Sequence, residues 1–220
     1  MAIIIEPVRT QEDEVAVLHI RSQVFEIEMG ITIPKMDLAA QPGALHLLAR
    51  VGHDADSAGV LSIIDTSGDA HALSIHGVEL EAGAKVARYT QLAVLRPYRG
   101  MRIPMMMMLE AHRRFVGPEH FSHTWLLFDA ERAESSFLCR RLGFIPMAPA
   151  ALSEYGRTRL LVRDENEPRS KQALIDARQY VEESVKTFRR QQSHAVLDRA
   201  ADRASERAIE GVSTGRIVSV

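Results

Sequence analysis

The chain has 220 residues, of which 46% are hydrophobic and 25% charged, and its 27 basic and 29 acidic residues give a formal net charge of -2. This length allows one domain with an appendage, and the composition is that of a folded protein and not of a disordered one. A nearly neutral chain has no overall field that attracts nucleic acid or an anionic membrane, so we expect neither as a partner.

The cysteine content limits the kinds of metal site that the chain can form, and its first residues indicate where in the cell we expect it. Cys139 is the only cysteine, which excludes an intramolecular disulfide framework and a zinc site of paired cysteines. The spacing of His71 and His76 does not bring the two rings onto one side of a strand, so we expect no metal. Glu6 and Arg9 precede any apolar stretch of signal length. We therefore expect a cytoplasmic protein that is not inserted in a membrane.

The N-terminal residues predict a strand followed by a capped helix. Residues 3–8 are typical of a strand, and Thr10 with Asp13 has the form of a capping box that opens a helix to about residue 25. Three apolar side chains predict the core-facing side of this helix: Val15, Leu18 and Val24.

Beyond this helix, short apolar runs and turn residues predict alternating strands and helices. Strands are predicted at residues 45–51, 60–64, 86–95 and 123–128 and between 144 and 162, and helices at residues 103–115 and 130–142. Residues 165–210 contain no glycine and are typical of a helical tail. We therefore predict a domain at residues 1–164 and a helical extension at residues 165–220.

A basic loop that contains glycine separates one predicted strand from the next helix. Residues 91–104, Gln-Leu-Ala-Val-Leu-Arg-Pro-Tyr-Arg-Gly-Met-Arg-Ile-Pro, resemble the signature of GNAT acyltransferases, an apolar strand followed by Arg-Gly-x-Gly-x-Gly at a helix start. A helix N-terminus offers unpaired N–H groups and a positive dipole end, which suit the pyrophosphate of coenzyme A. The resemblance assigns donor binding to Leu92, Ala93, Val94, Arg99, Gly100, Met101, Arg102, Ile103 and Pro104. Arg102 and Pro104 stand where the family usually has glycines, and proline lacks an N–H donor.

A second match concerns the single cysteine. Residues 135–144, Ser-Ser-Phe-Leu-Cys-Arg-Arg-Leu-Gly-Phe, resemble the Phe-Tyr-x-x-Leu-Gly-Phe end of the helix that follows strand five in this family. In many members a tyrosine at the position of Cys139 protonates the departing thiolate of coenzyme A. The resemblance makes Cys139 a candidate catalytic acid. The alternative is that Cys139 is a small buried residue of a core-facing helix.

A third match lies at the first helix. The Arg-x-x-Val-Phe segment at residues 21–25 resembles an opening that some GNAT proteins share with acyl-homoserine-lactone synthases and N-acyl amino acid synthases, and the last two groups draw acyl chains from acyl carrier protein. The resemblance implies that Arg21 and Phe25 contact the substrate. The carboxylates that follow the helix, beside the expected acceptor pocket, are Glu26, Glu28 and Asp37. Of these, Glu28 is the candidate base that takes a proton from the amine.

Together the matches imply an α/β (α+β) protein with the GNAT fold: a mixed, mostly antiparallel sheet flanked by helices, with the donor entering where strands four and five splay apart. They imply an enzyme, an N-acyltransferase that moves an acetyl or longer acyl group from acetyl-CoA or another acyl-CoA directly to a small-molecule amine. Two alternatives stay open: an N-acyl amino acid synthase that uses acyl carrier protein, and a catalytically inactive GNAT-like module for sensing or assembly. Lactone synthases usually carry Glu and Arg where this chain has Arg88 and Gln91, so a lactone product is not expected.

The predicted tail helix carries one apolar stripe. Its side chains recur at spacings of three and four residues: Leu174, Ala177, Val181, Val185 and Phe188. Such a stripe suits a dimer contact, a lid on the acyl site, a docking face for a carrier protein, or a helix folded back on its own domain. We expect a homodimer whose contact includes residues 170–190.

Overall fold

The computed structural model describes residues 2–31, 43–52, 55–69, 73, 78, 80–129, 133–147, 149, 151–153 and 156–187. The predictions made for Asp37, His71, His76 and Phe188 lie outside these ranges, as does everything beyond residue 187. Among the described residues, no helix combines the length and the apolar character that a membrane span requires.

In the part of the chain that the structure describes, eight strands form one mixed sheet. The strands are β1 (Ile3–Pro7), β2 (Ala44–Val51), β3 (Asp56–Asp65), β4 (Val86–Val94), β5 (His123–Asp129), β6 (Ile145–Pro146), β7 (Ala151–Ser153) and β8 (Gly156–Asp164). The order across the sheet is β1-β2-β3-β4-β5-β8-β6, and β7 pairs with β8. Only β4 and β5 run parallel among these pairs, so the predicted mixed and mostly antiparallel sheet is confirmed.

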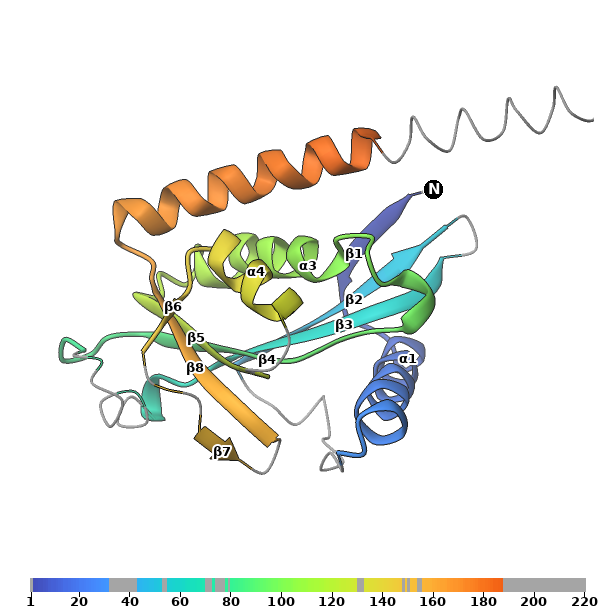
Figure 1. Ribbon diagram of the computed structural model, residues 1–220, viewed down its shortest axis with the longest axis horizontal. Helices are drawn as coiled ribbons and strands as arrows, with labels where there is room; N and C mark the ends of the chain where they lie inside the picture. The colour runs from blue at the N-terminus through green and yellow to red at the C-terminus, as the bar shows by residue number, and fades with distance from the viewer. Residues whose placement is uncertain are drawn as a thin grey trace, which may run out of the picture. The chain divides into compact units, whose positions relative to one another are not determined.

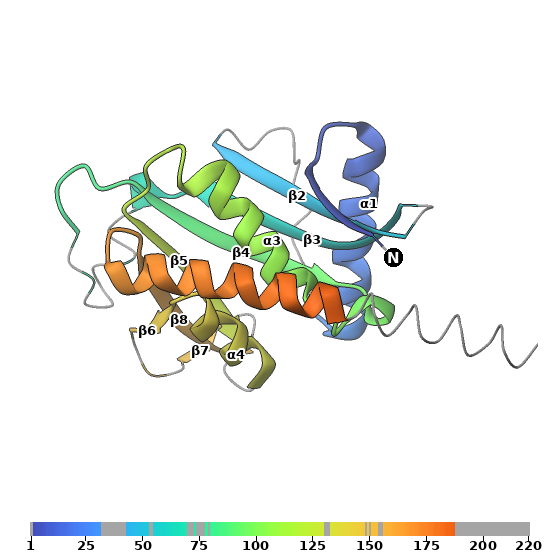
Figure 2. The same ribbon diagram turned by 90° about the horizontal axis from the view of Figure 1, so that it is seen from above.

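Helices cover both faces of this sheet. The described helices and helical turns are α1 (Gln11–Arg21), α3 (Ile103–Ala111), α4 (Ala133–Arg141), π-helical turns at Ser22–Glu28 and His112–Val116, 3-10 turns at Ser67–Asp69 and Arg96–Tyr98, and a helix at residues 168–187. α1 lies on one face and α3 and α4 on the other (Figure 1), and the view from above shows α3 crossing β2, β3 and β4 (Figure 2). The predicted capping box is present, because Thr10 Oγ1 accepts from the N–H of Asp13 and the Asp13 carboxylate accepts from the N–H of Thr10.

The predicted core side of α1 is wrong at two positions. Val15 and Leu18 are 61% and 44% exposed, whereas Val17, Ile20 and Val24 are buried against β2, β3 and β4. At about 100° per residue, Val15 and Val24 lie on opposite sides of a helix and cannot share a stripe. The stripe that starts at Val17 is the one that includes Val24.

The chain forms two compact units, residues 1–181 and residues 182–220. The first unit includes the beginning of the C-terminal helix, where side chains about one turn apart are buried: Ser170, Leu174, Ala177 and Val181. Gly143, which follows α4 with a φ of 81°, approaches this helix so closely that a Cβ there would lie 3.1 Å from Cβ of Ala173. The apolar stripe up to Val181 therefore packs within its own domain.

Candidate active site

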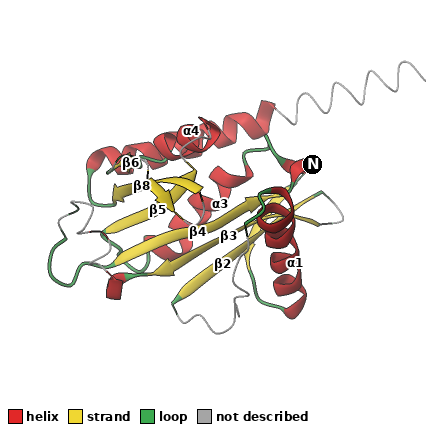
Figure 3. Cartoon of the chain, turned by 60° about the horizontal axis from the view of Figure 1, so that its bottom comes forward, coloured by secondary structure: helices red, strands yellow, loops and turns green. Residues whose placement is uncertain are grey.

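The parallel pairing of β4 and β5 is short. It ends at Arg88 and Trp125, whereas β4 continues to Val94 and β5 to Asp129. Beyond Arg88, the described ladder of β4 lies on its β3 side alone, at the centre of the sheet in Figure 3. The two strands thus separate beside the predicted donor residues of β4, which are Leu92, Ala93 and Val94.

A β-bulge interrupts β4 beside this opening. Val60 pairs with Ala93 and Ser62 with Thr90, which leaves two residues of β4 opposite one residue of β3. Gln91, within the bulge, adopts a left-handed φ of 54°. A bulge bends its strand and redirects the backbone groups beside it, and such bulges are frequent next to active sites.

The predicted donor loop leads from β4 into α3. Gly100 has a φ of 89°, and Arg102 caps the helix in the left-handed conformation, with a φ of 63°. Arg102 therefore adopts the backbone geometry that a glycine adopts without strain, at a cost of roughly 1–2 kcal/mol. The N–H of Met106 donates to the carbonyl of Arg102, so the N–H groups of Ile103 and Met105 lie ahead of this bond and form the positive end of the helix.

The structure brings Arg99 and Glu28 into contact. Arg99 Nε donates to the carbonyl of Val94 at 3.0 Å, and Arg99 Nη2 lies 2.5 Å from Glu28 Oε2. Arg99, predicted to bind the acyl donor, is therefore paired with Glu28, the predicted base. Their side chains are 43% and 31% exposed, respectively. Glu28 must release Arg99 before this oxygen can take a proton from an amine.

Cys139 lies in the last turn of α4 with 3% of its surface exposed. Burial raises the pKa of its thiol to about 12. Proton transfer from such a thiol to a thiolate of ordinary pKa, about 8.5, is uphill by several kcal/mol. Among the described contacts, no hydrogen bond joins the Cys139 side chain to the donor loop. These properties favour a packing role over an acid role.

Arg21, a predicted substrate residue, ends α1 where the π-helical turn begins. The residue is 4% exposed, and burial lowers the pKa of its guanidinium to about 10. Arg21 Nη2 donates to Ser62 Oγ at 2.6 Å, and Ser62 Oγ lies 2.6 Å from His46 Nδ1. The other predicted substrate residue, Phe25, is half-buried and packs on the core between α1 and the sheet.

Ser62 and His46 were missed by the sequence analysis. His46 lies within the apolar strand segment 45–51 and Ser62 within the apolar segment 60–64. A polar side chain at a buried strand position needs a hydrogen-bond partner, so the sequence indicated that each residue has one. It could not have identified the partner, because Arg21 lies on another element.

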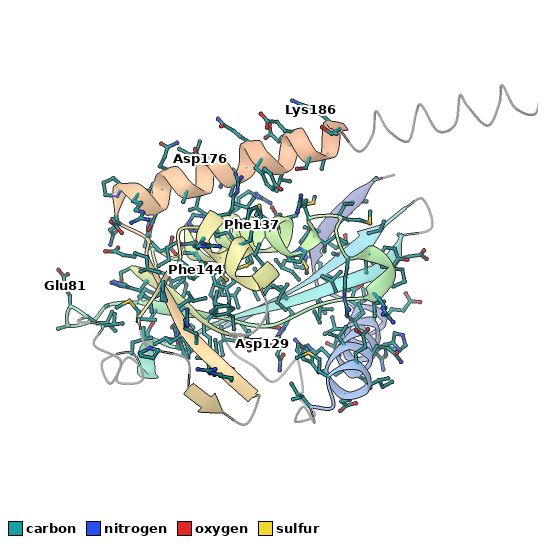
Figure 4. All side chains as sticks on the ribbon, viewed as in Figure 1. Glu81, Asp129, Phe137, Phe144, Asp176 and Lys186 are labelled. Atoms are coloured by element: carbon teal, nitrogen blue, oxygen red, sulfur yellow. The ribbon has the colours of Figure 1, made fainter. Side chains whose placement is uncertain are left out.

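A cationic and aromatic cluster joins the donor loop to the C-terminal helix. The Tyr180 ring has the guanidinium of Arg141 at 4.2 Å and that of Arg102 at 5.1 Å from its centroid, within the range of cation–π contacts. Phe137 of α4 meets Tyr180 edge to face, and Figure 4 shows it beside this helix. Sequence reasoning missed Tyr180, which fixes the side chain of one predicted donor residue.

A buried ionic network contacts β5 at the end where β5 still pairs with β4. Arg163 Nε donates to Glu165 Oε1 at 2.8 Å, and Arg163 Nη1 donates to the carbonyl of Leu142 at 3.0 Å. Glu165 also accepts from Thr124 and lies 3.2 Å from His112 Nε2. Burial alone would raise the pKa of Glu165, but its contacts with His112, Arg163 and Thr124 lower it below the ordinary value.

Comparison with known proteins bears on the fold. No family model and no curated protein matches the sequence. Solved structures do match: the N-acyl amino acid synthase FeeM from uncultured soil microbes has a TM-score of 0.56 at 16% identity over 76% of this chain and 92% of its own. Arabidopsis thaliana NAA60 in complex with acetyl-CoA has a TM-score of 0.61 at 12% identity over 76% and 100%. An acetyltransferase of the GNAT family from Staphylococcus aureus Mu50 has a TM-score of 0.51 at 14% identity over 74% and 99%.

The chain has the GNAT fold. The resemblance seen in residues 21–25, 91–104 and 135–144 is confirmed at the level of the fold. In this GNAT fold, the separation of β4 from β5, the bulge at Gln91 and the N-terminus of α3 lie along one continuous segment of chain.

Proposed function

We propose that the chain is an N-acyltransferase that moves an acetyl or longer acyl group from acyl-CoA directly to a small-molecule amine. The observation that carries this proposal is the parting of β4 from β5 beside the N-terminus of α3. A pantetheine chain suits the space between two separated strands, and a pyrophosphate suits unpaired N–H groups at a positive helix end.

The proposed roles follow from these positions. The backbone of residues 92–94 lines the pantetheine arm, and residues 99–104 hold the pyrophosphate through N–H groups and arginine side chains. The amine nitrogen bonds to the thioester carbonyl carbon as the carbon–sulfur bond breaks, so the thiolate gains a proton and the amine loses one. Glu28 is the proposed base, acting once its ion pair with Arg99 opens.

An N-acyl amino acid synthase that uses acyl carrier protein is the second candidate. The resemblance of residues 21–25 to N-acyl amino acid synthases supports it, and so does the donor loop, in which Arg102 and Pro104 replace the glycines that let a backbone approach a pyrophosphate closely. Acyl carrier protein presents one phosphate where coenzyme A presents three. Turnover of an acyl carrier protein thioester at least tenfold faster than that of the matching acyl-CoA would favour this candidate.

The proposal is tested with the whole protein, coenzyme A and a panel of amines. Calorimetry measures the binding of coenzyme A, and release of free thiol from acetyl-CoA and longer acyl-CoA measures turnover. Binding with turnover of at least one amine is expected. Tight binding without turnover of any amine would favour the inactive sensing or assembly module, and absence of both would contradict the assignment of the site.

Cys139→Ala is expected to change turnover by less than a factor of three while lowering the melting temperature. Burial of the thiol accounts for the expected loss of stability. Its raised pKa makes it a poor acid, which accounts for the small expected change in turnover. Thiol release and a melting curve for each variant are the measurements. A rate reduced by about 10²-fold with unchanged melting would make Cys139 the catalytic acid.

We also propose a cytoplasmic homodimer that needs no metal, with the dimer contact including part of residues 170–190. Because Leu174, Ala177 and Val181 are buried within one chain, a second chain would have to use the exposed side of this helix or residues beyond it. Ile175, 48% exposed, is an apolar residue available for such a contact. Ile175→Asp is expected to shift the mass measured by light scattering from dimer to monomer with little loss of stability. A monomeric unmodified protein would remove this proposal.

A further inference from the structure

Arg21 carries a charge that has been withdrawn from water. It is 4% exposed at the junction of α1 and the π-helical turn, on the face of the sheet opposite α3. Arginine is almost never fully buried unless it is paired, because an unpaired charge in an apolar surrounding is costly. The partner of Arg21 is therefore informative.

Among the described residues, the partner of Arg21 is neutral. Its Nη2 donates to Ser62 Oγ, and no described carboxylate lies within ion-pair distance of it. Two other arginines of the domain have carboxylate partners: Arg163 pairs with Glu165, and Arg50 with Glu6 and Asp13. The buried Nε of Arg21 has no hydrogen-bond acceptor among the residues that the structure describes.

Ser62 fixes the direction of the guanidinium. Ser62 Oγ accepts from Arg21 and also lies 2.6 Å from His46 Nδ1, so the hydroxyl is held between the guanidinium and the imidazole. A guanidinium presents its Nε–H and one Nη–H along the same edge, the fork that a carboxylate takes with two parallel hydrogen bonds. Since Ser62 is neutral, the charge of Arg21 suits an anionic ligand.

This edge lies close to the proposed transfer site. Ser62 pairs with Thr90 of β4, and the bulge residue Gln91 follows directly. Neighbouring strands are about 4.8 Å apart, so Ser62, the residue that Arg21 contacts, lies one strand spacing from the backbone beside the bulge. Few bonds separate the carboxylate of an amino acid from its amine, so an amino acid held at Arg21 would direct its amine toward β4.

We propose that Arg21, oriented by Ser62, binds the carboxylate of the acceptor, so that the acceptor is an amino acid or a close carboxylate-bearing amine. This inference rests on the acyltransferase proposal and narrows its acceptor class. The carboxylate would supply the missing charge, and the acceptor amine would lie toward β4.

The test compares matched acceptors that differ only in this charge. Each amino acid is paired with its own α-carboxamide, and thiol release from the best acyl-CoA gives kcat/KM for both. We expect at least one amino acid to exceed its amide by tenfold or more, because a charge-assisted pair contributes that much or more. Arg21→Gln should abolish this preference through KM, and Arg21→Lys should restore part of it. Arg50→Gln, an arginine of β2 with carboxylate partners of its own, should keep the preference.

A binding measurement on the unmodified protein keeps the inference testable if the Arg21 variants do not fold or if no acceptor turns over. N-acetyl amino acids are the expected products, and at least one of them should raise the melting temperature more than its amide does. Amides that are used and bound as well as the acids would overturn the carboxylate site, while coenzyme A binding and turnover would leave the acyltransferase proposal standing. Loss of coenzyme A binding would instead point to failure of the proposed function.

Discussion

Arg163→Met is expected to lower the free energy of unfolding by about 3–5 kcal/mol, the effect typical of removing one partner of a buried ion pair. Methionine keeps most of the apolar stem of arginine, so the main losses are the ion pair with Glu165 and the hydrogen bond to the carbonyl of Leu142. Glu165, 9% exposed, would keep Thr124 and His112 as its described side-chain partners and lose the cation that offsets its burial. Urea unfolding followed by circular dichroism measures the difference.

A surface ion pair provides the matched control for this variant. Glu110 contacts Arg113 and Arg114 on the exposed side of α3 and the turn that follows it. Exposed pairs contribute little because water already solvates both charges, so Glu110→Gln should leave the unfolding midpoint nearly unchanged. Equal losses in the two variants would show that the buried network contributes no more than the surface pair.

Most of the fold could be predicted because its signals are local. The capping box at Thr10 and Asp13, the apolar runs of the strands and the glycine after α4 each lie within a few residues. The core face of α1 could not be predicted in the same way. Apolar residues at 15–18 and at 20 offer two stripes, and the choice between them depends on β2, β3 and β4, which pack against only one.

The candidate site also has a part that could be predicted from the sequence and a part that could not. The donor loop is predicted from residues 91–104 because they are contiguous; in the structure this segment follows the point where β4 leaves β5, and its role in binding the donor stays a prediction. The contact of Arg21 with Ser62 joins positions 41 residues apart, and Arg102 meets Tyr180 on a helix far along the chain. Such contacts depend on how the elements pack, so a single sequence carries no direct signal for them.

Arg99→Glu is expected to weaken the binding of coenzyme A at least tenfold. A charge-assisted hydrogen bond to a phosphate contributes roughly 1.5–3 kcal/mol, which corresponds to a factor of about ten to more than one hundred. The new carboxylate would also lie near the N-terminus of α3 and beside Glu28, where it would repel the donor. Calorimetry of coenzyme A with each purified variant measures the effect.

Two further variants separate a phosphate contact from a role in shaping the loop. Glu28→Gln removes the carboxylate that now holds Arg99, which frees the guanidinium for phosphate, so affinity should be unchanged or higher. Arg113→Glu makes the same charge change at a distance from the loop and should leave affinity within a factor of two or so, because salt screens exposed charges beyond about 10 Å.

The pattern across the three variants decides the role of Arg99. If Arg99 contacts the donor phosphates, Arg99→Glu is the only one of the three variants that loses affinity for coenzyme A. The difference in affinity between this variant and the unmodified protein then shrinks as the salt concentration rises. If Arg99 instead only ties Glu28 to the end of β4, Arg99→Glu and Glu28→Gln should lose affinity alike, since each breaks the same ion pair. Equal affinity in all three variants would contradict the assignment of residues 99–104 to the donor.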